Sequence, residues 1–137
     1  MTYDLISTRK IRKTVEIKTP EDIYKVLDRY TGLKQEHFLL ITLNGNHEII
    51  SVSIVTIGLA NRTIIHPREL ITKAYLDNAT AIVVAHNHPS GCTKPSDEDV
   101  AMTGDIKRAC EVMGLHLIDS LIISKRGFYS FRRERFL

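Results

Sequence analysis

The sequence has few cysteines, little excess charge and no long apolar run, and each of these absences excludes a class of protein. Its two cysteines, Cys92 and Cys110, form neither a disulfide framework nor a Cys-x-x-Cys motif. A net charge of +3 neither demands nor excludes a nucleic-acid partner. No apolar run reaches the length of a membrane span, and the N-terminus is too polar for a secretory signal. We therefore expect a cytoplasmic protein without a membrane partner.

The composition is that of an ordinary globular protein, with 43% hydrophobic and 26% charged residues in a chain of 137. This length suits one domain with a core of its own. Strand-like and helix-like segments follow one another without an internal repeat or a linker. They predict an α/β fold of the α+β type, in which helices flank a single mixed sheet.

Residues 1–19 differ from the rest because they are polar and basic. They form either a short strand at Val15–Ile17 or an arm that docks a partner, and residues 20–137 form the domain. In chain order, we expect helices at 20–32, 67–78 and 96–113, and strands at 36–43, 47–57, 62–66, from 81 through the apolar run, 115–124 and 128–131. Asn44-Gly45 predicts a type I′ turn between the first two strands, and Gly114 ends the last helix.

The most informative stretch is the apolar run 81–85, which ends in His86-Asn87-His88. Successive side chains of an extended chain point to opposite faces, so both histidines project to one side and Asn87 to the other. Asp99 follows eleven residues after His88. Two imidazoles and a carboxylate provide three ligands of a tetrahedral zinc site. A fourth position left for water is typical of a catalytic zinc rather than a structural one.

The same residues also allow a purely structural interpretation. A histidine at the end of a strand is often a hydrogen-bonded polar residue. Ser96 after Pro95 fits a helix N-cap, and the acidic residues up to Asp99 complement the positive end of the helix dipole. The two interpretations are compatible, because a helix N-terminus would hold Asp99 rigidly enough to serve as a ligand.

The spacing His86-x-His88, seven residues, Ser96, two residues, Asp99 resembles the zinc signature of the JAMM (JAB/MPN) metalloprotease superfamily. Further short motifs resemble its RadC-like branch in particular: 86–91, Pro95-Ser96, 66–69 and 119–123. The resemblance runs from about residue 35 to the C-terminus. It implies a JAB/MPN-like fold for the domain and one Zn²⁺ bound by His86, His88 and Asp99.

The resemblance also implies two catalytic residues. In the family a glutamate at the start of an early strand carries the proton of the attacking water, and Glu36 is the matching position. Glu48 and Glu69 are alternatives nearby in the sequence. The family's serine, here Ser96, donates a hydrogen bond to the oxyanion of the tetrahedral intermediate.

Two positions depart from the family pattern. Cys92 follows Gly91, where RadC-like sequences commonly have an acidic or other polar residue. A thiol at this place could coordinate zinc, block it or be oxidised, or it is simply a small loop residue. Ser120 follows Asp119, where the family often has histidine, so the role of that histidine is in doubt here.

Three functions fit these observations. The first is a zinc-dependent hydrolase of peptide or isopeptide bonds, acting on a peptide or protein substrate. The second is an accessory protein of DNA repair, and for it we expect only weak, salt-sensitive binding of nucleic acid. Longer members carry an N-terminal helix-hairpin-helix module for which these 137 residues have no room. The third is a zinc-binding interaction module without catalysis. The sequence leaves the substrate and the oligomeric state open.

Overall fold

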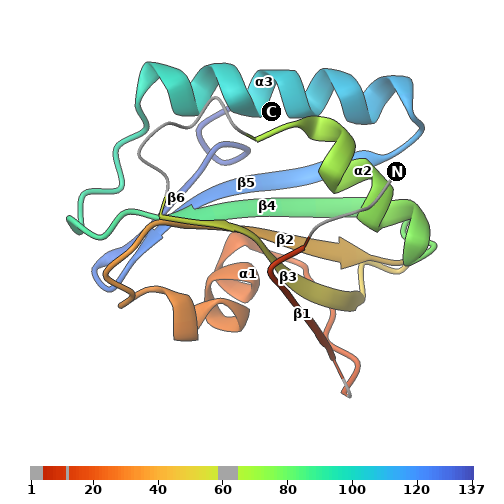
Figure 1. Cartoon of the computed structure of the whole chain (residues 1–137), viewed down its shortest axis with the longest axis horizontal. Helices are drawn as coiled ribbons and strands as arrows, with labels where there is room; N and C mark the ends of the chain where they lie inside the picture. The colour runs from red at the N-terminus through yellow and green to blue at the C-terminus, as the bar shows by residue number, and fades with distance from the viewer. Residues whose placement is uncertain (1–4, 12, 59–64) are drawn as a thin grey trace.

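The described part of the chain forms one sheet of six strands in the order β1-β3-β2-β4-β5-β6 (Figure 1). The structure is a computed structural model that describes residues 5–11, 13–58 and 65–137. The strands are β1 (Ser7–Lys10), β2 (His37–Leu43), β3 (Ile49–Ile57), β4 (Ala81–Asn87), β5 (His116–Ser124) and β6 (Gly127–Ser130). The helices are α1 (Pro20–Val26), the 3₁₀ turn η1 (Asp28–Tyr30), α2 (Pro67–Leu76) and α3 (Asp97–Val112).

Among the described strands, only β4 and β5 run parallel, and every other neighbouring pair is antiparallel. A parallel pair needs a long crossover, and α3 provides it. Helix α1 covers one face of the sheet, whereas α2 and α3 cover the other (Figure 1). The predicted fold class, a mixed sheet flanked by helices, is therefore confirmed.

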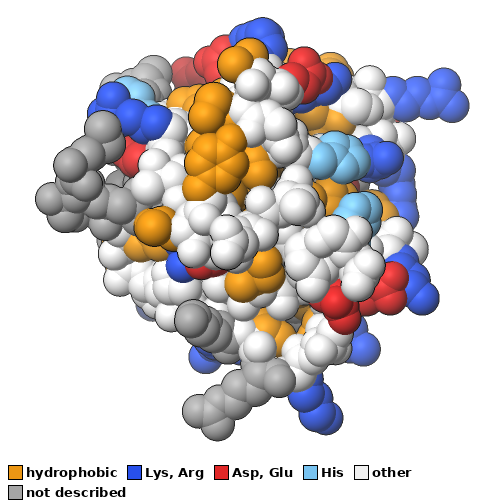
Figure 2. Space-filling view, turned by 90° about the vertical axis from the view of Figure 1, so that its right-hand side faces the viewer, with side chains coloured by type: hydrophobic (Ala, Val, Ile, Leu, Met, Phe, Trp, Pro, Cys, Tyr) orange, Lys and Arg blue, Asp and Glu red, His pale blue; other side chains and the backbone are white. Residues whose placement is uncertain are grey.

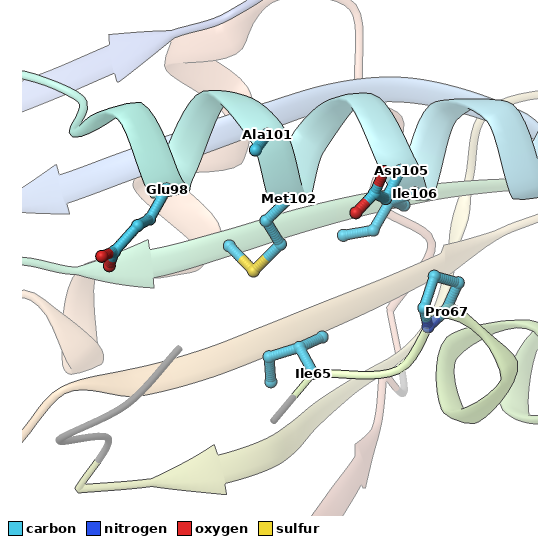
Figure 3. A pocket seen from close by; sticks show the side chains of 7 residues that line it. All are labelled: Ile65, Pro67, Glu98, Ala101, Met102, Asp105 and Ile106. Carbon is cyan, nitrogen blue, oxygen red and sulfur yellow. The ribbon is translucent and has the colours of Figure 1, made fainter. Parts of the chain in front are cut away.

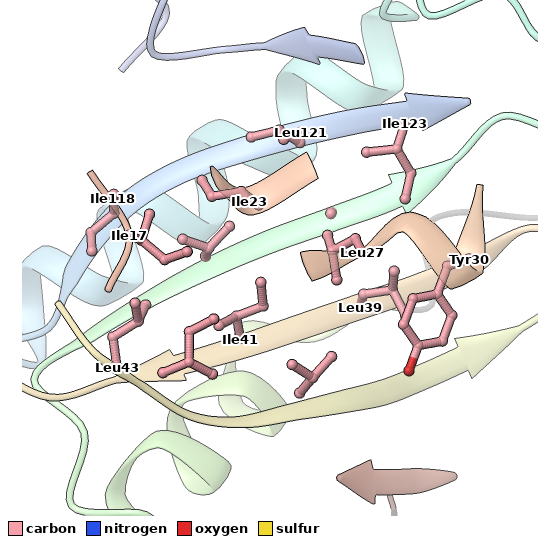
Figure 4. Close-up of a cluster of buried hydrophobic side chains, with 14 of the residues drawn as sticks. Ile17, Ile23, Leu27, Tyr30, Leu39, Ile41, Leu43, Ile118, Leu121 and Ile123 are labelled. Atoms are coloured by element: carbon pink, nitrogen blue, oxygen red, sulfur yellow. The ribbon is translucent and has the colours of Figure 1, made fainter. Parts of the chain in front are cut away.

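The core is divided by the sheet, and the alternation of side chains along each strand explains the division. On β2, Leu39 and Ile41 pack on the α1 side (Figure 4), whereas Phe38 and Leu40 pack on the side of α2 and α3. Strand β4 lies between β2 and β5, and all seven of its residues are buried. A strand covered on both faces is apolar throughout instead of alternating, as its sequence shows up to Ala85.

The β2–β3 hairpin exists as predicted, but the type I′ turn was wrong. That turn needs positive φ at both central residues, yet Gly45 does not adopt positive φ and His47 does, at 59°. The amide of His47 donates to the carbonyl of Asn44 at 3.0 Å. The side chain of Asn44 also accepts from the amides of Asn46 and Glu48, at 2.9 and 3.0 Å. These bonds stabilise a loop of three residues, 45–47, in place of two.

The N-terminal segment also differs from the prediction. The strand lies at Ser7–Lys10 and pairs with β3, whereas the expected strand at Val15–Ile17 is reduced to one bridge between Glu16 and Glu48. Helix α1 begins at Pro20 behind the Thr19 cap, as predicted, but ends at Val26 rather than residue 32. The expected strand at 62–66 falls mostly outside the described residues, since only residues 65 and 66 are described and neither lies in a strand.

One end of the sheet faces the viewer in Figure 2, where β2 ends and β4 and β5 begin. Hydrophobic side chains reach the surface there beside charged and histidine side chains. Exposed hydrophobic residues include Tyr75 and Leu76 at the end of α2 and Val112 and Met113 at the end of α3. Among the described residues, no helix has the length and apolar character to cross a membrane.

Truncating a side chain of the α1-side core should destabilise the fold strongly. Leu121 in the middle of β5 is fully buried, so Leu121→Ala should lower the free energy of unfolding by about 2–5 kcal/mol. Val112→Ala is the control, because this side chain is 83% exposed and should change stability by about 0.5 kcal/mol or less. Urea unfolding followed by circular dichroism measures both. Equal shifts of the two midpoints would contradict the assigned core.

Candidate metal centre

Four titratable side chains converge where β4 ends. His86 is the second-to-last residue of β4, His88 follows that strand, and Asp99 belongs to the first turn of α3. Glu36 immediately precedes β2, whose Phe38 is paired with His86. Antiparallel pairing thus brings the start of β2 to the end of β4. Glu36, His86 and His88 each offer one ligand atom within 4.8 Å of the others.

The distances between donor atoms are those of ligands around one ion. His86 Nε2 lies 3.1 Å from His88 Nε2 and 3.2 Å from Asp99 Oδ1, and His88 Nε2 lies 3.5 Å from Asp99 Oδ2. Atoms bound to a tetrahedral zinc at about 2.0–2.2 Å are separated by about 3.3–3.6 Å. Glu36 Oε1 is farther away, at 4.0 Å from His86 Nε2. Two imidazoles and a carboxylate are a donor set that suits zinc.

Burial and hydrogen bonding set the ionised, ligand form of Asp99 apart from its neighbours. The side chains of Asp99 and His86 are 0% and 2% exposed, whereas those of Glu36 and His88 are 11% and 12% exposed. Burial raises the pKa of Asp99, but the bonds with His86 and His88 and the Ser96 amide outweigh it and hold the pKa below its usual range. Asp99 is therefore a carboxylate at neutral pH.

The two histidines are oriented by different means. His88 Nδ1 lies 2.8 Å from the carbonyl oxygen of Cys92, which directs Nε2 into the centre. The loop can return this carbonyl because Gly91 adopts a φ of 87°, which favours glycine. The ring of His86 is stacked on Phe38, with centroids 6.3 Å apart, and its buried Nδ1 has no hydrogen-bond partner among the described residues.

Asp99 serves the helix and the centre together. The amide of Asp99 donates to Ser96 Oγ at 3.1 Å, and the amide of Ser96 donates to Asp99 Oδ2 at 2.9 Å. This capping box confirms the predicted helix start. The same Oδ2 atom faces His88. The capping interpretation and the ligand geometry therefore coexist in one carboxylate.

Asn87 lies on the sheet face opposite the histidines, as its place in the strand predicted. Its Oδ1 accepts from the amide of His37 at 2.6 Å, and its Nδ2 donates to the carbonyls of Gln35 at 3.0 Å and Leu33 at 3.3 Å. The expectation that Asn87 ties the strand end is confirmed. Its partners lie 50 to 54 positions away along the chain, and nothing in the sequence indicated them.

The alternatives to Glu36 lie elsewhere. Glu48 follows the far end of β2, where it is bonded to Asn44. Glu69 lies in the first turn of α2 and does not belong to the group of potential ligands found among the described residues. Ser120, the second departure from the family pattern, is buried and lies 3.1 Å from the hydroxyl of Thr103. It packs α3 against β5.

A hollow of about 230 Å³ runs along α3, starting one residue before Asp99 (Figure 3). Ile65, Met102 and Ile106 give it an apolar floor, and Glu98 and Asp105 lie at its edge. Glu98 directly precedes Asp99 in the first turn of α3, but none of the four converging side chains lines this hollow.

The two cysteines should differ greatly in reactivity. Cys92 is exposed, whereas Cys110 is 1% exposed and burial raises its pKa to about 11. Because the thiolate is the nucleophile, iodoacetamide should label Cys92 in the folded protein at pH 8 and modify Cys110 at least about a hundredfold more slowly. Peptide mass spectrometry measures both rates. In denaturant the rates should become similar, and equal labelling of the folded protein would contradict the burial of Cys110.

The sequence matches a family model and several curated proteins. A family model described as "RadC-like JAB domain" matches residues 17–136. A UPF0758 protein of Methanospirillum hungatei is 39% identical over 128 residues, which are 92% of this chain and 57% of that protein. UPF0758 proteins of Streptococcus uberis and Thermotoga maritima are 44% and 38% identical, over 94% and 82% of this chain and 58% and 50% of theirs. The chain thus spans about half the length of the curated relatives it matches.

Proposed function

Since this chain belongs to the RadC-like JAB domain family, we propose that it is a zinc-dependent hydrolase of peptide or isopeptide bonds. One observation carries the proposal: the Nε2 atoms of His86 and His88 lie 3.1 Å apart, each lies 3.2–3.5 Å from an oxygen of the Asp99 carboxylate, and the carboxylate of Glu36 lies 4.0 Å from His86 Nε2. A structural zinc site fills all four positions with protein ligands, whereas this donor set leaves one position for a reactant.

His86, His88 and Asp99 would hold the zinc ion. The ion would supply Lewis acidity, which makes water a nucleophile at neutral pH and polarises the carbonyl under attack. The protein's part is to fix the three donors before the metal arrives. The Cys92 carbonyl fixes His88, Phe38 packs against His86, and the capping box fixes Asp99.

Glu36 is the proposed general base. Its carboxylate lies 4.0 Å from His86 Nε2. From there it could accept a hydrogen bond from a reactant in the fourth ligand position. It would take the proton of the attacking water and deliver it to the leaving amine. Its partial exposure, like that of His88, makes this the open side of the centre, whereas Asp99 and His86 form the buried side.

Ser96 is the proposed donor to the oxyanion. Its Oγ accepts from the amide of Asp99, and a hydroxyl that accepts a hydrogen bond can still donate one. The bond fixes the oxygen at the N-terminus of α3, a helix of 16 residues. The positive end of the helix dipole favours negative charge at the same place. Serine and helix would thus stabilise the developing oxyanion together.

Metal analysis and cleavage profiling together test the proposal. The purified protein should contain one zinc per chain and should cleave members of a peptide or isopeptide library, with activity lost in a chelator and restored by zinc. A zinc-loaded protein that cleaves nothing in either library would favour the interaction module instead. Tight, sequence-selective binding of nucleic acid at physiological salt would favour the DNA-repair accessory.

A further inference from the structure

The backbone around Glu36 is held from two sides. On the β3 side, the amide of Gly58 donates to the carbonyl of Glu36 at 2.7 Å. On the β4 side, the backbone pairing of β2 runs from Leu43 opposite Ala81 only to Phe38 opposite His86. Beyond that pair, hydrogen bonds of the Asn87 side chain connect the segment before β2 to the end of β4.

The hydrogen bonds of Asn87 enclose Glu36 along the chain. Asn87 accepts from the amide of the residue after Glu36 and donates to the carbonyl of the residue before it. A third bond reaches Leu33, and the carbonyl of Gln35 also lies 2.8 Å from Nδ1 of His37. Asn87 is fully buried, so water does not compete for these bonds. The side-chain amide of Asn87 offers an acceptor and a donor in one plane, and these pair with the N–H of His37 and the carbonyl of Gln35.

We propose that Asn87 is a positioning residue for the proposed reaction: it holds the backbone of residues 33–37 so that the Glu36 carboxylate stays beside the fourth ligand position. This inference rests on the proposed function of Glu36 as the base. Asn87 itself faces the α1 side of the sheet, away from the imidazoles that flank it in sequence. It acts only through the backbone, and a misplacement of about 1 Å can cost a hundredfold in rate.

The first test needs no substrate. In the metal-free protein, Asn87→Ala should speed amide hydrogen exchange of the peptide covering residues 33–38 by about tenfold or more, because the His37 amide loses its acceptor. Exchange in β5 should be unchanged, and circular dichroism should show a folded variant. As purified, before the metal is removed, the variant should still contain one zinc per chain, because the proposed ligands are intact. Unchanged exchange at 33–38 would overturn the proposal whether or not the protein is an enzyme.

The second test separates positioning from a general structural role. Asn87→Ala should lower kcat about 10- to 100-fold and change KM less than about twofold. In a Glu36→Gln background, where the base is already absent, Asn87→Ala should lower kcat less than about threefold further. An equal loss in both backgrounds would overturn the proposal. Asn87→Ser, a neutral side chain whose hydroxyl can still make a hydrogen bond, should fall between wild type and alanine, and it replaces alanine if that variant does not fold.

Asn44→Ala is the matched control. Asn44 binds two backbone amides at the opposite end of β2, so its loss should loosen the hairpin without changing kcat. If Asn44→Ala slows turnover as much as Asn87→Ala, the effect of Asn87 is one of stability and the proposal fails. A wild type that cleaves nothing would overturn the proposed function, and the exchange experiment would then decide alone whether Asn87 holds the segment.

Discussion

Replacing Glu36 with glutamine is expected to leave one zinc per chain and to slow turnover by about two to four orders of magnitude. Glutamine keeps the size and hydrogen-bonding shape of the side chain but cannot take a proton. The carboxylate is 4.0 Å from His86 Nε2 and is proposed as the base and not as a ligand, so its charge should not be needed to complete the ligand set. Steady-state kinetics on a substrate found by library profiling, with elemental analysis of the same samples, measures both effects.

Glu48→Gln and Glu69→Gln are the controls for this experiment. Both residues lie outside the converging group of described side chains, so each variant should keep the rate within about threefold of wild type. An active Glu36→Gln combined with an inactive Glu69→Gln would move the base to α2 and leave the hydrolase proposal in place. Loss of zinc in Glu36→Gln would instead make Glu36 a ligand.

Zinc binding itself should be lost in His88→Ala. With His88 removed, two of the three proposed donors remain, Asp99 and the His86 ring, and a two-donor site holds zinc too weakly to survive purification. The wild type should contain one zinc per chain and the variant about none. Zinc at 100 times its Kd stabilises the folded state by about 2.7 kcal/mol, so added zinc should raise the Tm of the wild type only.

His116→Ala is the matched histidine control, because His116 begins β5 at the end of the sheet away from the centre. It should keep zinc and the zinc-dependent rise in Tm. Equal zinc contents in wild type and His88→Ala would refute the assignment of the ligands. Zinc lost from both histidine variants would point to a general loss of folding instead.

Much of the fold followed from local patterns. The apolar run before His86 gave the buried strand, and Pro95-Ser96 with Asp99 gave the start of α3 at the correct residue. Turn chemistry was less decisive. Asn44-Gly45 predicted the hairpin, but the side chain of Asn44 bonds two later amides and lengthens the loop. Which N-terminal residues pair with β3 depends on long-range contacts that a basic polar segment does not encode.

The sequence pattern alone predicted part of the candidate centre, and the separation of its residues along the chain explains which part. Residues 86–99 are close in sequence, so strand alternation and a helix start bring His86, His88 and Asp99 together. Glu36 came from the family resemblance, because only the register of β2 against β4 places it there. The same register creates the bonds of Asn87 to residues 33–37. The Cys92 carbonyl could not be foreseen, since every residue in that loop has one.

The pairing of β2 with β4 also sets an order of assembly. The three proposed ligands lie in one short stretch, 86–99, whose closure costs little chain entropy. The start of β2 is separated from them by about fifty residues of sequence. Pairings between such distant segments form late in folding. A partly folded chain would gain the ability to capture an ion before gaining the base. In a hydrolase of the proposed kind, this topology would bring the base into the centre last.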